Sequence, residues 1–372
     1  MRLDDNQQAF FALLRAGLWE QDVCLGQFGN IDYSVIYKLA EEQSVVGLVA
    51  AGLEHVVDAK VPKEDALTFI GTALQLEQRN TSMNRFIGEI IDKMRTKDIY
   101  ALLVKGQGIA QCYERPMWRS CGDVDLFLSG DNYKKTAEYL RPVASSVDEE
   151  NEYNQHLSMT VDSWVVELHG TLRSGLWRRI DRVLDDVQRA AFYDGKVRSW
   201  MNGKTQVFLP GADEDVVFVF SHILQHFFKE GIGLRQICDW CRLLWTYKDS
   251  LDVKLLEQRL RSMGIMTEWK AFASLAVNYL GMPDNTMPLY SASKKWARKT
   301  DKIIDFILET GNFGHNRNYS YYKKSPYLMF KAISFWRHSK DTFKHSLIFP
   351  KDATLVWLER LNEGIKMVAK GK

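Results

Sequence analysis

The sequence predicts an α+β fold in which a small core with a mixed sheet lies between two helical regions. Two observations predict this fold. Apolar residues with helical spacing dominate both ends of the chain, whereas short apolar runs that stop at turn residues are confined to the middle. We therefore divide the 372 residues into an N-terminal helical region (1–97), an α/β core (98–210) and a C-terminal helical region (211–372).

The N-terminal region contains three stretches with helical periodicity. Asp5 can cap the first of them, whose apolar face begins at Phe10. The second and third stretches cover 36–57 and 66–94, and the helix breaker Pro62 separates them. This part of the chain is therefore expected to be entirely helical.

The central region alternates short apolar runs with turns, which is typical of buried strands. Strands are predicted over 99–104, 125–128, 157–161, 164–169 and 206–209. Helices are expected at 109–113 and from Asp131 or Asn132 to Leu140. The turn at Asp162–Ser163 is expected to join the third and fourth strands as an antiparallel hairpin.

The C-terminal region returns to helical spacing. Asp213 is expected to cap a helix that ends at Lys229, and a second helix is expected from Leu234 to Tyr247. Further helices are predicted from there to the C-terminus.

Composition and charge narrow the class of protein. The chain is 46% hydrophobic and 26% charged, which excludes a disordered or low-complexity protein. Its 49 basic and 47 acidic side chains leave a net charge of +2, so the average does not indicate a nucleic-acid-binding or polybasic membrane protein. Arg15 interrupts the first apolar stretch, no long apolar run occurs, and the five cysteines are an odd number. We therefore expect a cytoplasmic protein with reduced thiols.

Two aspartates carry the clearest chemical signal. Asp123 and Asp125 stand two apart at the start of a predicted strand, so both carboxylates project from one face while Val124 points to the other. Neighbouring carboxylates repel each other unless a cation compensates, and Mg²⁺ prefers oxygen ligands of this kind. An Asp-x-Asp pair alone, however, is frequently only a turn residue followed by a surface acid.

A third acid strengthens the interpretation as a metal site. Glu167 and His169 share one face of a later strand that is otherwise apolar. Together, Asp123, Asp125 and Glu167 can hold two divalent ions about 4 Å apart, an arrangement that supports phosphoryl transfer. His156, just before the hairpin, can reach the same cleft but is interpreted as structural.

Residues upstream of the aspartates suit a phosphate group. Gly106 follows the first predicted strand and would let phosphate oxygens approach backbone N–H groups at the start of a helix. Lys105 and Arg119 supply positive charge that can neutralise the phosphates.

Three stretches resemble a family of uncharacterised bacterial nucleotidyltransferases in the superfamily related to DNA polymerase β. They are Leu-Leu-Val-Lys-Gly (102–106), Arg-Ser-Cys-Gly-Asp-Val-Asp-Leu (119–126) and Val-Glu-Leu-His (166–169). The resemblance extends over about the first 250 residues. It implies a nucleotidyltransferase core with two Mg²⁺ ions, or Mn²⁺, at Asp123, Asp125 and Glu167. It also implies a nucleoside triphosphate, expected to be ATP, near Lys105 and Gly106, and we add Arg119 and His169 to this nucleotide site.

The predicted reaction moves a nucleoside monophosphate from the triphosphate to an acceptor and releases pyrophosphate. A small molecule, a protein and RNA all stay open as acceptors. Gln107 departs from the superfamily pattern, which usually has Ser or Gly here, and it lacks the hydroxyl that helps to hold the triphosphate. The alternative function is a non-catalytic module that keeps the fold and binds a nucleotide, RNA or a protein.

Polar residues on two later helices are candidates for the acceptor side of the site. His222 and His226 lie four residues apart, as do Arg235 and Asp239, so each pair shares one helix face. These residues either line the site or form a buried polar network that joins the two helices. A structural zinc site built from His222, His226, Cys238 and Cys241 is a further alternative.

Residues 317–351 concentrate positive charge and aromatic side chains. The segment has eight Lys or Arg, one Asp and nine aromatic residues, so the rest of the chain carries a net charge of −5. Basic residues interleaved with aromatics suit single-stranded nucleic acid, which predicts a weak contact with it. The other interpretation is a helical layer in which the aromatics pack and the lysines are solvated.

Overall fold

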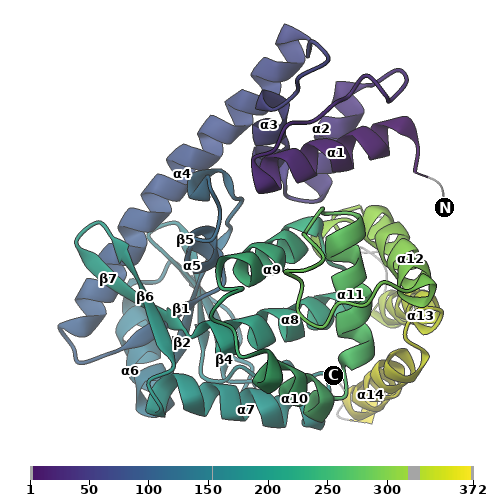
Figure 1. Cartoon of the computed structure of the whole chain (residues 1–372). Helices are drawn as coiled ribbons and strands as arrows, with labels where there is room; N and C mark the ends of the chain where they lie inside the picture. Colours follow the sequence, from purple (N-terminus) through teal and green to yellow (C-terminus); the bar gives the residue numbers. More distant parts are fainter. Residues whose placement is uncertain (1–2, 153, 317–326, 370–372) are drawn as a thin grey trace.

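The computed structural model describes residues 3–152, 154–316 and 327–369, and it confirms the predicted α+β fold (Figure 1). The N-terminal helices are α1 (Asp5–Trp19), α2 (Tyr33–Glu42), α3 (Val46–Glu54) and α4 (Lys63–Arg95). The central part contains β1 (Ala101–Val104), α5 (Gly106–Ala110), η1 (Pro116–Trp118), β2 (Asp123–Leu128), α6 (Gly130–Leu140), η2 (Arg141–Val143), β3 (Ser146–Val147), β4 (His156–Val161), β5 (Trp164–His169), α7 (Arg178–Tyr193), β6 (Val197–Asn202) and β7 (Thr205–Pro210). The C-terminal helices are α8 (Ala212–Lys229), α9 (Leu234–Thr246), α10 (Val253–Met263), α11 (Met266–Asn278), α12 (Lys294–Thr310), η3 (Asn312–Gly314), α13 (Tyr327–Ser346) and α14 (Pro350–Ala369).

The central sheet is mixed and has the strand order β1-β2-β5-β4-β3. β2 and β5 pair in parallel, whereas the other neighbours pair antiparallel. The predicted hairpin around Asp162–Ser163 joins β4 and β5. Because the parallel pairing aligns Asp125 with Glu167, the two acids lie side by side although 42 positions separate them in the sequence.

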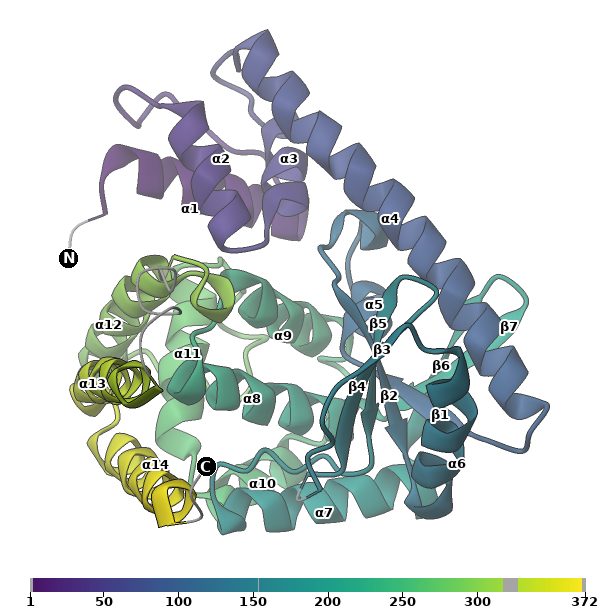
Figure 2. The same cartoon turned by 180° about the vertical axis from the view of Figure 1, so that it is seen from behind.

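The two faces of this sheet have different neighbours. Val124 and Leu126 project from β2 into a core cluster that includes Ile87 and Ile90 of α4. Phe127 belongs to a second cluster, which also contains residues of the N-terminal and C-terminal helices. Figures 1 and 2 show α4 on one side of the sheet and α8 and α9 on the other. The charged face of β2 is therefore turned toward the C-terminal helices.

Several elements differ from the predictions. The N-cap of α1 is Asp4 rather than Asp5, because the Asp4 carboxylate accepts a hydrogen bond from the Gln7 N–H in a capping box. The N-cap of α8 is Gly211, and Asp213 lies in the first turn, where a negative charge suits the helix dipole. The predicted strand at 206–209 is β7, which pairs with β6 in a separate sheet. The strands β3 and β6 and the helix α7 were not predicted.

The N-terminal helices pack closely on each other and on the C-terminal part. A Cβ atom on Gly17 of α1 would lie 1.8 Å from the Leu48 carbonyl oxygen of α3, so the two backbones can meet only with glycine at this position. Trp19 of α1 donates a hydrogen bond of 2.6 Å to the carbonyl of Leu280, and its ring lies 5.5 Å from that of Trp245. The beginning of the chain is thus fixed to residues 226 or more positions later.

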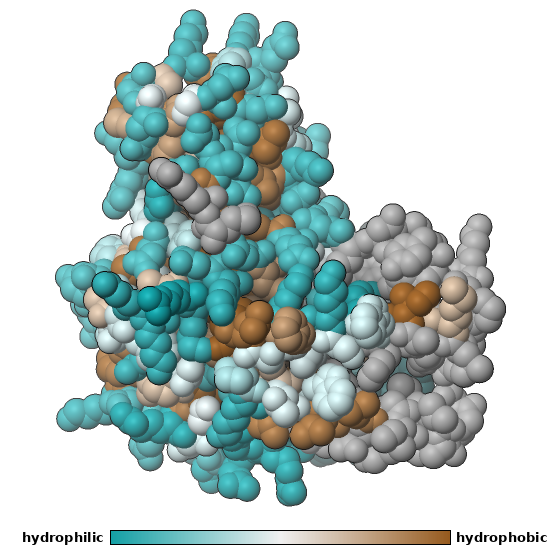
Figure 3. All heavy atoms as spheres, turned by 90° about the vertical axis from the view of Figure 1, so that its right-hand side faces the viewer, coloured by the Kyte–Doolittle hydropathy of each residue, from teal (hydrophilic) through white to brown (hydrophobic). Residues whose placement is uncertain are grey.

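The surface is mainly hydrophilic on the face drawn in Figure 3, where the apolar residues form small separate patches. Among the helices in the described part of the chain, none combines the length and the apolar character that crossing a bilayer requires.

Candidate active site

A polar cavity of about 490 Å³ opens beside the parallel pair β2 and β5. This volume lies within the range of cavities that bind small molecules, about 300–1,000 Å³. The side chains that line it include Lys105, Asp123, Asn151, Asn154, His156, Glu167, His169, His222, Gln225, His226 and Phe313. A smaller cavity of about 50 Å³ shares Lys105, Asp123 and His222 with it and extends to Asp125 and Arg235. Of these residues, Asn151, Asn154, Gln225 and Phe313 were not predicted to belong to the site.

The three predicted acids gather around one ammonium group. Lys105 Nζ lies 2.6 Å from Asp125 Oδ1, and Asp125 is only 2% exposed. Repulsion from Asp125, together with burial, raises the pKa of Asp123. Within the described residues, no side chain or backbone group donates a hydrogen bond to the Asp123 carboxylate. The three carboxylates therefore lie close together around this ammonium.

The backbone at the end of β1 places this ammonium. Lys105 has φ 55° and ψ −145°, and Gly106 follows with φ +42°. A side chain in such a conformation costs about 1–3 kcal/mol, so the surrounding structure must hold it. Burial alone would lower the pKa of Lys105, but Asp125, Glu167 and Asp123 together raise it. Lys105 is therefore charged at neutral pH.

Two histidines flank Glu167 at the mouth of the acid cluster. His156 Nε2 lies 3.2 Å and His169 Nε2 lies 3.5 Å from Glu167 Oε2, and His169 Nε2 lies 2.7 Å from Asp125 Oδ1. Burial would raise the pKa of Glu167, but the hydrogen bonds from His156 and His169 and the charge of Lys105 lower it. Burial would lower the pKa of His169, whereas its bonds to Asp125 and Glu167 raise it.

His156, which the sequence places within reach of the cleft, lines the cavity. β4 and β5 pair His156 directly with His169, and the two rings lie 4.9 Å apart. The signal was present in the sequence, since a two-residue turn at Asp162–Ser163 fixes this register.

The helix α8 forms the opposite wall. His222 and His226 lie one turn apart with their Nε2 atoms 3.0 Å from each other, and His226 Nδ1 lies 3.0 Å from Glu230 Oε2. Burial, followed by the charge of Lys105, places the pKa of His222 well below its usual value. His222 is therefore a neutral imidazole that faces the acids.

Arg119 and Asp239 form a buried ion pair. The Arg119 guanidinium donates hydrogen bonds of 2.8 and 2.6 Å to the two Asp239 oxygens, and a third of 3.0 Å to the Ser120 carbonyl. Tyr113 donates to the same carboxylate at 2.8 Å. Arg119 is only 3% exposed but lines the smaller cavity, so its contact with the nucleotide stays a prediction. Asp239 lines the same small cavity, and its role on the acceptor side likewise stays a prediction.

Arg235 differs from Arg119 in its surroundings. Its Nη1 donates a hydrogen bond of 2.9 Å to the Ser120 carbonyl, while its Nε has no partner among the described residues. It lines the smaller cavity with Asp123 and Asp125, and its charge lowers the pKa of Asp123. Arg235 is thus a cation that faces the acid cluster.

Gln107 points away from the cavity. Its Nε2 donates a hydrogen bond of 2.8 Å to Asn80 Oδ1 on α4, and the residue is 1% exposed. Asn80 in turn donates to the carbonyls of Met117 and Arg119. The glutamine therefore helps to fix the loop that leads into β2, which explains a residue without a hydroxyl at this position.

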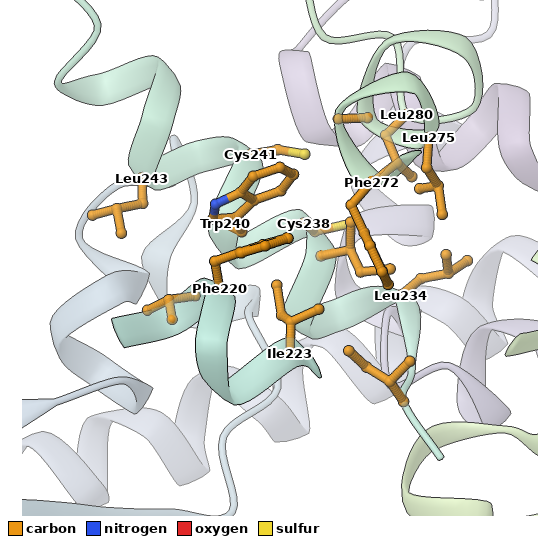
Figure 4. Close-up of a cluster of buried hydrophobic side chains, with 14 of the residues drawn as sticks. Phe220, Ile223, Leu234, Cys238, Trp240, Cys241, Leu243, Phe272, Leu275 and Leu280 are labelled. Atoms are coloured by element: carbon orange, nitrogen blue, oxygen red, sulfur yellow. The ribbon is translucent and has the colours of Figure 1, made fainter. Parts of the chain in front are cut away.

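The structure contradicts the alternative of a zinc site. Cys238 and Cys241 are fully buried beside Phe272 and Leu275 on the core side of α9, whereas His222 and His226 line the cavity (Figure 4). Burial raises the pKa of both thiols. In the described part of the chain, the group of three potential metal ligands is instead His156, Glu167 and His169, whose ligand atoms lie within 4.8 Å of one another.

The segment predicted to contact nucleic acid is only partly described, because residues 317–326 lie outside the described residues. In the remainder, Trp336 and Phe343 are exposed, whereas Phe349 is buried and the His345 ring lies 4.6 Å from that of Phe227. Some aromatics of the segment thus pack in the core, and the nucleic-acid contact stays a prediction.

The acid cluster fits the divalent ions that the sequence predicts. Asp123, Asp125 and Glu167 offer carboxylate oxygens, the ligand type that Mg²⁺ and Mn²⁺ prefer. The repulsion that raises the pKa of Asp123 favours an added cation.

The chain matches the family described as "Uncharacterised nucleotidyltransferase" over residues 29–281. Comparisons with curated proteins and with solved structures give no significant match. The matched residues make up more than half of the chain and contain every strand of the central sheet together with α8 and α9. The chain therefore belongs to this family of uncharacterised nucleotidyltransferases.

Proposed function

We propose that this protein is a metal-dependent nucleotidyltransferase that transfers a nucleoside monophosphate from a triphosphate, expected to be ATP, to an acceptor. The observation that carries the proposal is the alignment of Asp125 with Glu167 on adjacent parallel strands, with Asp123 lining the same 490 Å³ cavity. Family membership supports a transferase, and the acid cluster supports the metal dependence. The acceptor is a small molecule, a protein or an RNA end.

In this proposal Asp123, Asp125 and Glu167 hold two Mg²⁺ ions, or Mn²⁺. When bound, the ions neutralise phosphate oxygens and lower the pKa of the attacking hydroxyl. Lys105 holds the Asp125 carboxylate in place through its 2.6 Å contact. Arg235 takes the role of phosphate contact that the sequence assigned to Arg119. Its Nε has no partner among the described residues, whereas Nε, Nη1 and Nη2 of Arg119 all donate hydrogen bonds.

The remaining residues position the reactants. The acceptor oxygen forms a bond to the α-phosphorus, and the bond from this phosphorus to the bridging oxygen of pyrophosphate breaks. The acceptor hydroxyl would lose its proton with the help of the bound ions, and the neutral His222 imidazole can accept a hydrogen bond from this hydroxyl. Catalysis then rests mainly on positioning and charge neutralisation.

The Asp123→Asn substitution tests the proposal. The variant should lose transfer of α-labelled nucleotide by about 1000-fold or more, equivalent to about 4 kcal/mol of barrier height, because one carboxylate ligand is lost. The acceptors offered would be separated small-molecule, protein and RNA fractions. Asp186→Asn, in an exposed carboxylate on α7, is the matched control and should transfer label normally. Undiminished transfer by Asp123→Asn would refute the mechanism.

Calorimetric titration separates the enzyme from the non-catalytic alternative. ATP, GTP, CTP and UTP are titrated into the protein with and without Mg²⁺. The enzyme should bind its triphosphate only in the presence of metal. Equal binding without metal would favour a binding module.

A further inference from the structure

The hairpin β4–β5 builds a second group of ligands beside the acid cluster. It pairs His156 with His169 and Ser158 with Glu167, so that the imidazoles and the carboxylate emerge from one face. The Nε2 atoms of the two histidines lie 3.2 and 3.5 Å from Glu167 Oε2. Ligands about 2.1 Å from a metal ion lie about 3.0–3.4 Å apart in octahedral or tetrahedral geometry. Two of the three spacings are therefore close to those of ligands around one ion, and all three ligand atoms lie within 4.8 Å of one another.

The chemistry of this group differs from that of the aspartates. Imidazole nitrogen suits Zn²⁺, Fe²⁺ and similar ions, whereas Mg²⁺ requires oxygen ligands. We propose that His156, Glu167 and His169 form a binding position for a divalent transition ion of the Zn²⁺, Fe²⁺ or Co²⁺ type, selective against Mg²⁺. The proposal rests on the proposed function in one respect, because Glu167 serves both positions.

The position is accessible and keeps free coordination sites. The side chains of His156, Glu167 and His169 are 35%, 24% and 14% exposed and line the large cavity. Three protein ligands with open positions are typical of catalytic rather than structural metal sites. An ion bound here would meet a substrate that enters the cavity.

Asp125 connects the two positions. In the structure, His169 Nε2 lies between Asp125 Oδ1 at 2.7 Å and Glu167 Oε2 at 3.5 Å. A metal ion requires a nitrogen without a proton, so ion binding ends the hydrogen bond from His169 to Asp125. Asp125 retains its contact with Lys105 at 2.6 Å, which keeps this carboxylate compensated.

Co²⁺ is the probe that tests the inference. The full-length protein is freed of metal with a chelator and titrated with Co²⁺ in excess Mg²⁺, and absorbance in the visible range reports binding. Paramagnetically shifted imidazole N–H signals in the proton NMR spectrum report nitrogen ligands. We expect one Co²⁺ ion with both signatures, and displacement of Co²⁺ by Zn²⁺ but not by Mg²⁺.

Substitutions identify the ligands. His156→Ala and His156→Gln should each weaken Co²⁺ binding by about 100-fold or more, since loss of a partner beyond the ligands already costs about 10–100-fold. His315→Ala, in an exposed histidine after η3, is the surface control. His226→Ala tests whether the neighbouring pair His222–His226 contributes to Co²⁺ binding. Both controls should bind Co²⁺ as the unmodified protein does.

Three results would overturn the inference: release of Co²⁺ by Mg²⁺ at similar concentrations, unchanged Co²⁺ affinity in folded His156 variants, or loss of Co²⁺ binding in His226→Ala. The proposed function can be refuted independently of this inference. Asp123→Asn should lose transfer but keep the Co²⁺ signals, because Asp123 is not among the three ligands. A protein that binds Co²⁺ through His156 but transfers no nucleotide would refute the function alone.

Discussion

Arg119 and Asp239, which the sequence assigns to the site, form a buried ion pair in the folded chain. Their ion pair connects α9 to the loop that precedes β2, and Tyr113 shares the carboxylate. Both partners are less than 5% exposed. When one partner of such a pair is removed, the other charge stays buried and uncompensated. The pair therefore fixes the loop before Asp123, and its contact with a substrate stays a prediction.

We predict that Arg119→Ala lowers the free energy of unfolding by about 3–5 kcal/mol, because Asp239 keeps an uncompensated charge. Urea denaturation measures the change. Arg189→Ala, which breaks an exposed pair with Asp186, is the matched control and should change stability by about 0.5 kcal/mol or less. A stable Arg119→Ala protein with weakened triphosphate binding would restore the nucleotide role to Arg119.

The chemical role of single site residues could be predicted better than which of these residues lie next to each other in the fold. Alternation along one strand places Asp123 and Asp125 on one face, and this needs no tertiary information. The proximity of Asp125 and Glu167 depends on a parallel pairing across 42 positions, which no local pattern specifies. The grouping was instead predicted from the chemistry of a metal site and from the resemblance to a family. Arg119 was assigned by charge alone, and charge does not reveal a buried partner 120 residues away.

At the scale of elements, the predictions succeed where burial produces a strong pattern. β5 begins and ends at the predicted residues, and β2 begins two residues earlier than predicted. β6 alternates between exposed and half-buried residues, so it has little apolar signal to detect. The helix α7 does have a signal, since Ile180, Leu184, Val187 and Ala191 recur at helical spacing and are buried.

The short connection from β1 to α5 requires its glycine. Gly106 has φ +42°, and a Cβ atom there would lie 3.3 Å from Cys121 Sγ. Gly106→Ala should lower the free energy of unfolding by about 1–3 kcal/mol, because alanine is strained in this conformation. Gly71→Ala is the contrasting control within α4. Its Cβ would meet no atom within 4 Å, so it should stabilise the protein by about 0.5–1 kcal/mol. Thermal or urea denaturation of both variants checks the pair, and equal effects would contradict this view of Gly106.

At the scale of the whole molecule, two neighbouring buried carboxyl groups connect the helices α7, α11 and α14. Glu268 of α11 is 1% exposed next to Asp352 of α14, and Asp352 accepts a hydrogen bond of 2.5 Å from Arg179 of α7. Burial, followed by the interaction with Asp352, raises the pKa of Glu268 to about 8. Glu268 is therefore protonated in the folded protein at neutral pH.

This shift predicts a pH dependence of stability. Between the ordinary pKa of 4.5 and about 8, the unfolded chain releases the Glu268 proton but the folded protein keeps it. The stabilisation of the folded protein by the Glu268 proton is complete below pH 4.5 and is lost as the pH rises toward 8. Glu268→Gln should remove this part of the slope in urea denaturation series from pH 5 to 8. Glu257→Gln, in a more exposed residue of α10, is the control. If the free energy of unfolding has the same slope against pH in Glu268→Gln and in the unmodified protein, burial does not shift the pKa of Glu268.

The division into regions 1–97, 98–210 and 211–372 stays a prediction, but the packing of α1 bears on how the protein can be handled. The family match begins at residue 29, after α1, although Phe10 and Leu14 of that helix lie in the same core cluster as Phe220 and Trp269. A fragment that began at residue 29 would lack α1 and would expose the apolar side of α3, against which α1 packs. We expect such a fragment to aggregate. The smallest fragment that folds on its own is therefore expected to include α1, although the family match begins after this helix.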